Sequence, residues 1–233
     1  MRRMYVLPFA VAAIVAGACS NQKERATREA PPASTVPRSE PSSVATTGTT
    51  DLSTQDAKDF LSHVATVDQL EIQLGKLAVT RGTSSEVRKF GQMMIDDHTS
   101  STDKLVTLEK DLKLDTPREL DDKHKDVRED LAKRSGSDFD REYANAMVDG
   151  HKDLLEQLES RIDKKGLDQW KGEMKGKTRI PAGGVPLLPD KSDNKTTMRI
   201  NQFAASIYPA VYAHLEAAKA LEQSVEHHGA NKR

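Results

Sequence analysis

MIDDH at residues 94–98 and MVDGH at residues 147–151 are two copies of one signature, set 53 residues apart in the chain. Each copy carries a methionine and a histidine that are four residues apart. In a helix, side chains at positions i and i+4 lie on the same face, and in both segments that face also carries the apolar residues. The pattern therefore predicts a duplicated helical hairpin whose imidazoles point into a helical bundle.

The apolar periodicity on either side of these copies predicts further helices. The expected helices span about residues 54–81, 84–115, 118–133, 137–165 and 197–228. The expected N-caps are Ser53 or Thr54, Thr83 or Ser84, and Ser137. Pro209 should kink the last helix. Four long amphipathic helices, a short charged one and no strand pattern predict an all-α antiparallel four-helix bundle with one accessory helix.

A long irregular insertion is expected between residues 166 and 195, before the last helix. Glycines and prolines concentrate there, and the helical periodicity fails. Trp170 is expected to dock against the bundle. The glycines lack the spacing of a phosphate-binding loop, so no nucleotide site is predicted.

An export signal is predicted at residues 1–19, where two arginines precede an apolar run and small residues come before Cys19. The run is shorter than the ~20 residues that a membrane-spanning helix needs. Cys19 is the only cysteine of the chain, and its position resembles the lipid-modified cysteine of a bacterial lipobox. Ordinary cleavage or an uncleaved anchor are the alternatives. Because Ser20 replaces the aspartate associated with inner-membrane retention, we expect a periplasmic lipoprotein anchored to the outer membrane.

The mature chain is expected to start with a disordered tether rich in Ser, Thr and Pro at residues 20–54. A bundle domain at residues 55–228 and a frayed tail at residues 229–233 follow. The 35 basic residues less the two arginines of the signal leave 33, against 36 acidic residues, a balance of −3. This charge argues against a nucleic-acid partner.

Several blocks of sequence, in this order, resemble the signatures of a bacterial exported family that is catalogued as domain of unknown function 4142, in the ferritin-like group. They are EIQLGKLA at 71–78, VRKF at 87–90, MIDDHT at 94–99, FDREY at 139–143, MVDGH at 147–151, YP at 208–209 and HL at 214–215. The resemblance covers about residues 55–225 and implies an exported, ferritin-like helical bundle, without an established activity. Residues 167–195 depart from the family pattern, in which this connection is short.

Four polar residues interrupt the apolar stripes, one on each long helix. They are Glu71, His98, His151 and His214. Imidazole nitrogen and carboxylate oxygen are ligands of zinc, iron or copper, so these residues are candidate metal ligands. Asp97 could join them or orient a histidine. Met94 and Met147 could add thioether ligands, which extends the alternatives to copper.

A di-iron ferroxidase is disfavoured, because such sites use Glu-x-x-His elements. The residues three positions before the histidines are Ile95, Val148 and Val211. The polar residues could instead form a buried hydrogen-bonded network without metal, which fixes the helix register. Counted from the turn at Gly82, Glu71 and His98 are offset by about 7 Å, which weakens a site that they share.

Two function classes remain open from the sequence. The first is a non-enzymatic, lipid-tethered envelope protein that supports stress tolerance or binds a protein partner, without a cofactor. The second is a metal-binding or redox protein with a mononuclear site inside the bundle. His63, His124 and the pair at residues 227–228 are expected at a surface, an edge or a frayed end, and no catalytic constellation is recognised.

Overall fold

The structure is a computed structural model that describes residues 51–175, 177 and 186–230, with side chains described as far as residue 227. The predicted export signal, Cys19, most of the tether, the end of the tail and the centre of the insertion lie outside the described residues. The helices are α1 (Thr54–Arg81), α2 (Ser85–Leu112), α3 (Asp122–Ala132), α4 (Gly136–Glu159), α5 (Lys164–Met174) and α6 (Lys195–Ala230). Within the described part, the prediction of an all-α fold is confirmed.

The helix starts follow from local capping chemistry. Ser53 and Asp56 form a capping box at the start of α1, and the Ser84 side chain accepts the backbone N–H of Val87 at the start of α2. Each cap is one of the two alternatives that the sequence offered. The helix α4 begins at Gly136 with Ser135 as its N-cap, two residues before the predicted cap, so the prediction of Ser137 is wrong. The helix α6 extends to Ala230, into the predicted tail.

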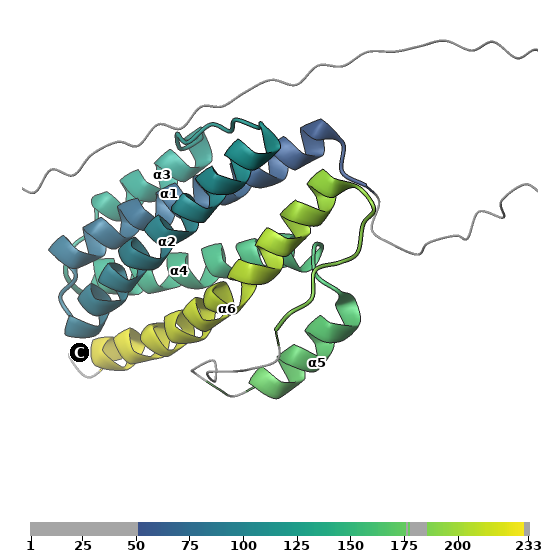
Figure 1. Ribbon diagram of the computed structural model, residues 1–233. Helices are drawn as coiled ribbons and strands as arrows, with labels where there is room; N and C mark the ends of the chain where they lie inside the picture. Colours follow the sequence, from purple (N-terminus) through teal and green to yellow (C-terminus); the bar gives the residue numbers. More distant parts are fainter. Residues whose placement is uncertain (1–50, 176, 178–185, 231–233) are drawn as a thin grey trace, which may run out of the picture. The chain divides into compact units, whose positions relative to one another are not determined.

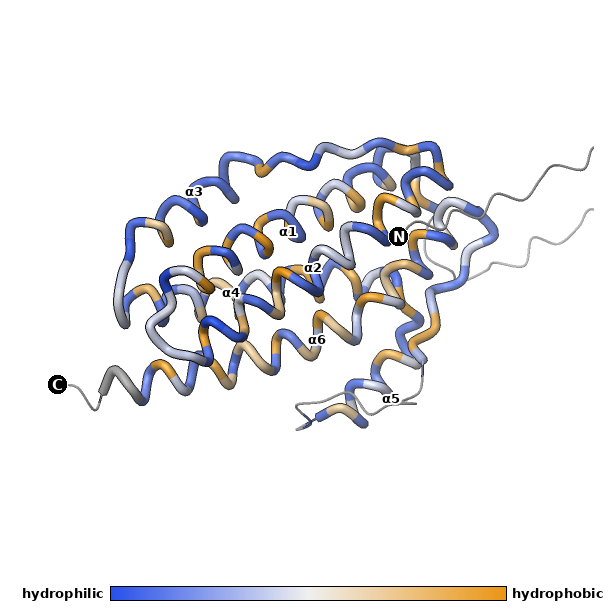
Figure 2. Tube along the Cα trace, turned by 60° about the vertical axis from the view of Figure 1, so that its left-hand side comes forward, coloured by the Kyte–Doolittle hydropathy of each residue, from blue (hydrophilic) through white to orange (hydrophobic). Residues whose placement is uncertain are grey.

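The four long helices lie side by side, and each of them packs mainly against two of the others (Figure 1). α1 packs along α2, and α4 packs along α6, while α1 also contacts α4 and α2 contacts α6. The short helix α3 lies against α1 and α4. Apolar residues recur along each of these helices (Figure 2), and the buried ones form one core cluster. The four polar residues of the sequence pattern, Glu71, His98, His151 and His214, are buried together with this core.

The insertion contains a helix, α5, which the sequence analysis did not predict. The side chain of Asp163 accepts the N–H of Gly166 and so caps its first turn. Leu167, Trp170 and Met174 form its buried stripe, and the Trp170 ring meets those of Tyr208 and Tyr212 of α6 edge-on, with centroids 5.6 Å and 5.1 Å away. Trp170 therefore docks as expected. The prediction of an irregular segment from residue 166 was wrong, because the prolines that disrupt helices start only at residue 181.

The described helices include none that is long and apolar enough to cross a bilayer.

α1 and α2 approach so closely that glycine is required where they cross. A Cβ atom on Gly75 would lie 2.6 Å from the carbonyl oxygen of Gly91, and one on Gly91 would lie 2.7 Å from the Cβ of Ala78. Real Cβ atoms essentially never show such contacts with backbone. This contact fixes the distance between α1 and α2, and with it the spacing of the polar residues that both helices carry further along.

We predict that Gly75→Ala destabilises the protein although alanine favours helices. The clash with the backbone of α2 should outweigh the helix-propensity gain and cost about 1–3 kcal/mol of unfolding free energy. Gly172→Ala in α5 is the control, because a Cβ there meets nothing within 4 Å; it should be neutral or stabilising by up to ~1 kcal/mol. Denaturant unfolding measures both. Equal effects of the two substitutions would contradict the close approach.

Candidate metal centre

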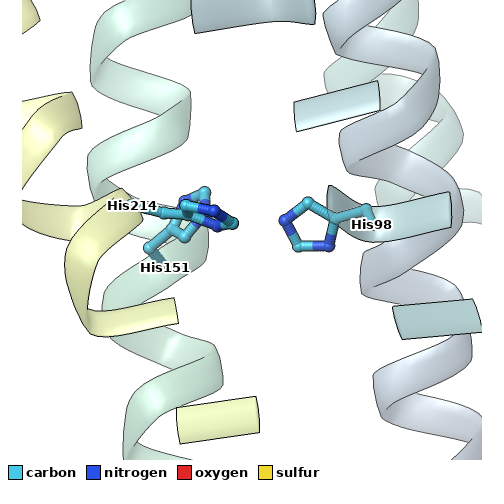
Figure 3. Close-up of side chains that lie close together, drawn as sticks. All are labelled: His98, His151 and His214. Atoms are coloured by element: carbon cyan, nitrogen blue, oxygen red, sulfur yellow. The ribbon is translucent and has the colours of Figure 1, made fainter. Parts of the chain in front are cut away.

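Three histidines from three different helices meet in the core. His98 of α2, His151 of α4 and His214 of α6 are 2%, 1% and 5% exposed. The centroids of their rings are 5.7 Å (98 to 151), 5.5 Å (98 to 214) and 5.4 Å (151 to 214) apart, so they form a nearly equilateral triangle. Figure 3 shows the ring of His98 pointing across the core toward the other two. We call these residues the histidine triad.

Two of the three rings have one nitrogen fixed by a buried acceptor. The His98 Nδ1–H donates to Asp68 Oδ1 of α1 at 2.8 Å. The His151 Nδ1–H donates to the carbonyl oxygen of Met147, one turn earlier on α4, at 2.7 Å. Because a carbonyl oxygen only accepts, the proton of neutral His151 is on Nδ1, which leaves Nε2 with a free lone pair.

The third ring is held through its other nitrogen, Nε2 instead of Nδ1. The His214 Nε2–H donates to Asp97 Oδ2 of α2 at 2.8 Å. Asp97 is half exposed, whereas Asp68 is fully buried. Neutral His214 therefore has its free lone pair on Nδ1. Each histidine of the triad is thus oriented by one hydrogen bond, as metal-binding histidines usually are.

The remaining ring nitrogens are buried and have no hydrogen-bond partner. They are His98 Nε2, His151 Nε2 and His214 Nδ1. An unpaired buried polar atom costs about 1–3 kcal/mol, so three of them in one place require an explanation. The triad offers three ligand nitrogens that all lie within 4.8 Å of one another. Such nitrogens lie within about 2.8 Å of a common point, so movements of about 0.7 Å would bring each to the 2.0–2.1 Å of a zinc–imidazole bond.

The environment keeps two of the three imidazoles neutral. Burial lowers the pKa of His151 well below its usual value, and the neighbouring His98 and His214 lower it further. Burial and His98 also lower the pKa of His214, although Asp97 opposes them. Burial likewise lowers the pKa of His98, but the hydrogen bond to Asp68 and the charge of Glu71 outweigh it, so the net shift is upward. A metal ion at the free ring nitrogens would therefore have to displace a proton only from His98, the one imidazole of the triad whose pKa is raised.

Glu71 lies beside the triad and does not belong to the mutually close set of ligand atoms. Its Oε1 is 3.8 Å from His151 Nδ1, but that N–H is directed to Met147 and the ring is neutral, so this contact is not an ion pair. Its Oε2 is buried without a partner. Burial raises the pKa of Glu71 to about 7, with a smaller upward contribution from Asp68. Gly150 makes room for this carboxylate, because a Cβ there would lie 3.0 Å from Glu71 Oε1.

The sequence analysis missed Asp68, the residue of α1 that contacts the triad directly. The register of α1 and α2, counted from the turn between them, could have indicated this residue. Counted from Gly82, Asp68 lies 14 residues back and His98 lies 16 forward, an offset of 2 residues or about 3 Å along the helices. The same count had already weakened a pairing between His98 and Glu71, and the structure places Asp68 at His98 instead.

The other candidates are distributed as follows. Asp97 orients His214, the role that the sequence analysis offered for it. Met94 and Met147 are fully buried in the core, and Met147 contacts His151 through its carbonyl oxygen. His63 is half-buried, and His124 lies in the first turn of α3, where Asp121 caps the helix by accepting its backbone N–H and also contacts its Nδ1.

The family comparison agrees with the signatures quoted above. The sequence model described as Domain of unknown function (DUF4142) matches residues 41–170, which is more than half of the chain. The chain belongs to the DUF4142 family. The matched segment contains Glu71, His98 and His151, whereas His214 lies beyond its end. No curated protein and no solved structure matches the chain significantly.

We predict that Glu71→Gln changes how the stability of the metal-free protein depends on pH. The unfolded carboxyl group has a pKa of 4.5 and the folded one a pKa of about 7, so the folded state binds more protons between these values. The contribution of this group to the free energy of unfolding of the wild type therefore falls as the pH rises from about 5 to 8. Glutamine cannot ionise, so the variant should gain on the order of 2 kcal/mol relative to wild type over that range.

Denaturant unfolding of both proteins at pH 5 and pH 8, with a chelator present, measures this difference. A stability difference that does not change between the two pH values would show that Glu71 titrates in the folded protein as it does in the unfolded chain.

Proposed function

We propose that this DUF4142 protein binds one divalent transition-metal ion inside its helical bundle, through His98 Nε2, His151 Nε2 and His214 Nδ1. Two observations carry the proposal: the three histidines each offer a ring nitrogen within 4.8 Å of the other two, and each ring has one buried, unpartnered nitrogen while its opposite nitrogen is fixed by an acceptor. A hydrogen-bonded network without metal explains only the outer nitrogens, by which we mean those bonded to acceptors: His98 Nδ1, His151 Nδ1 and His214 Nε2. It leaves the three inner nitrogens unpaired in the core, where each one costs free energy.

Zinc, or an ion of similar preference such as cobalt, fits the donor set best. Three neutral imidazoles with one open position form a known type of zinc site. The described contacts give the two methionines no role as ligands, so soft copper coordination has no support beyond their spacing. A di-iron site needs several free carboxylates, whereas Asp68 and Asp97 are engaged with imidazoles. We therefore infer a mononuclear centre rather than a ferroxidase.

The arrangement of the four long helices supports the finer reading of the fold. We infer an antiparallel, ferritin-like four-helix bundle, in which α1 and α2 form one hairpin and α4 and α6 form the other half. α3 is the accessory helix and α5 belongs to the insertion. In this arrangement each long helix contributes to the centre: α2, α4 and α6 supply imidazoles, and α1 supplies the Asp68 carboxylate that orients His98.

We further propose that the bundle is exported and held at the periplasmic face of the outer membrane by lipid on Cys19. The support is the signal-like sequence of residues 1–19 and the Ser-, Thr- and Pro-rich segment after it. Labelled palmitate should be incorporated into the wild type and not into Cys19→Ala. Equal labelling of the two proteins would rule out this anchor. We propose a non-enzymatic role there, in envelope stress tolerance or partner binding.

We predict that the mature protein, after loading with zinc and dialysis, retains one zinc ion per chain. His98→Ala, His151→Ala and His214→Ala should each lose it, because two imidazoles in a buried site hold the ion much more weakly. Asp68→Asn keeps all three ligands and should weaken zinc binding by about 10–100-fold, the usual effect of removing an orienting carboxylate. Elemental analysis and competition with a chromophoric chelator measure these effects.

His63→Ala is the matched control, since this half-buried histidine lies outside the triad. It should retain full zinc occupancy. Zinc should also raise the thermal stability of the wild type and of His63→Ala, because a ligand that binds only the folded state stabilises it. A wild type without zinc, or a loss in His63→Ala as large as in the triad variants, would contradict the proposal.

A further inference from the structure

A small cavity opens from the surface toward the triad between α2 and α6. Its volume is about 50 Å³. Buried Asp68, His98 and His214 line its inner part, and exposed Lys104 and Ala210 line its outer part. By this measure about 10–15 Å³ is enough for one water molecule, so the cavity has room for a molecule of a few heavy atoms.

The cavity lies on a different side of the triad from Glu71. His98 and His214 border the cavity, whereas His151, the residue that Glu71 approaches, does not. An ion held by three imidazoles needs a fourth donor in tetrahedral coordination. The fourth donor can therefore be either the Glu71 carboxylate from the core side or a small molecule from the cavity side.

Two observations favour the cavity side. Asp68 lines the cavity, and its Oδ2 is buried without a hydrogen-bond partner while its Oδ1 holds His98. A water molecule bound to the ion could donate to this oxygen, which gives the unpaired atom a partner. In addition, Glu71 has no oxygen in the set of mutually close ligand atoms that the three histidines form.

We propose that this cavity is the ligand site of the metal centre. The fourth position of the ion is taken by an exchangeable water molecule. Small monodentate ligands of two or three heavy atoms replace that water, entering between α2 and α6 past Ala210. The inference rests on the proposed metal site and adds to it an open coordination position with a strict size limit.

The test uses the full mature protein loaded with Co²⁺, whose visible absorption reports the ligands of the ion. Azide is the small probe, and 4-phenylimidazole is the large one. Azide should change the spectrum in a saturable way, whereas 4-phenylimidazole at equal concentration should leave both the spectrum and the cobalt content unchanged. Loaded protein whose spectrum does not respond to azide would overturn the inference and leave the metal site standing. Protein that fails to retain one cobalt per chain would overturn both.

Two matched variants locate the entry path. Ala210→Leu fills the mouth of the cavity and should weaken azide binding by about tenfold or more, while cobalt content stays at one per chain. Ala220→Leu adds the same side chain at an exposed position of α6 that does not line the cavity, and it should bind azide as the wild type does. Equal azide affinity of the two variants would contradict entry at this point.

Glu71→Gln tests which of the two candidate donors takes the fourth position of the ion, the Glu71 carboxylate or a small molecule in the cavity. If the cavity supplies the donor, the cobalt spectrum of this variant should match that of the wild type, and azide should bind with the same affinity. A changed spectrum together with tighter azide binding would show that Glu71 occupies the position, and would overturn the inference.

Discussion

Three imidazole nitrogens that face one another in a buried core are the constraint on which this structure depends. Each imidazole gives its outer nitrogen to an acceptor, namely Asp68, Asp97 or the carbonyl oxygen of Met147. The hydrogen bonds hold the rings so that the inner nitrogens cannot turn away to find other partners. A buried acceptor without a donor is costly, so the arrangement is favourable only when something shared occupies the centre. A divalent cation satisfies all three nitrogens at once.

The helix α1 contributes charge to this centre rather than a ligand nitrogen. Asp68 bonds His98, and Glu71 lies next to His151 with its pKa raised to about 7 by burial. The close approach of α1 and α2 at Gly75 sets the distance between these carboxylates and the histidine of α2. A cation bound here would have one buried negative charge from Asp68 close by, which lowers the cost of holding it in the core.

The sequence predicted the long helices and the histidines well, because both depend on periodicity. Met94 and His98 lie one turn apart, and so do Met147 and His151, so their shared inward face could be recognised without coordinates. The contacts between helices were harder to predict, since they depend on register. Asp68 was missed for that reason, and Glu71 was preferred because it follows the apolar stripe. The helix α5 was missed because the proline-rich end of the insertion was taken to describe all of it.

The two copies of the signature also differ in a way that only the structure explains. Asp97 in the first copy corresponds to Gly150 in the second. Asp97 reaches across to His214, whereas a side chain at position 150 would press against Glu71. The copies therefore place two similar histidines in one centre while their neighbouring residues serve different partners. The two copies lie on α2 and α4, and the third imidazole comes from α6.

X-ray absorption spectroscopy at the zinc edge of the loaded mature protein tests the central claim most directly. The account predicts three imidazole rings with nitrogens at about 2.0–2.1 Å and one further light atom. Fewer than three imidazoles, or a sulfur ligand at about 2.3 Å, would contradict it.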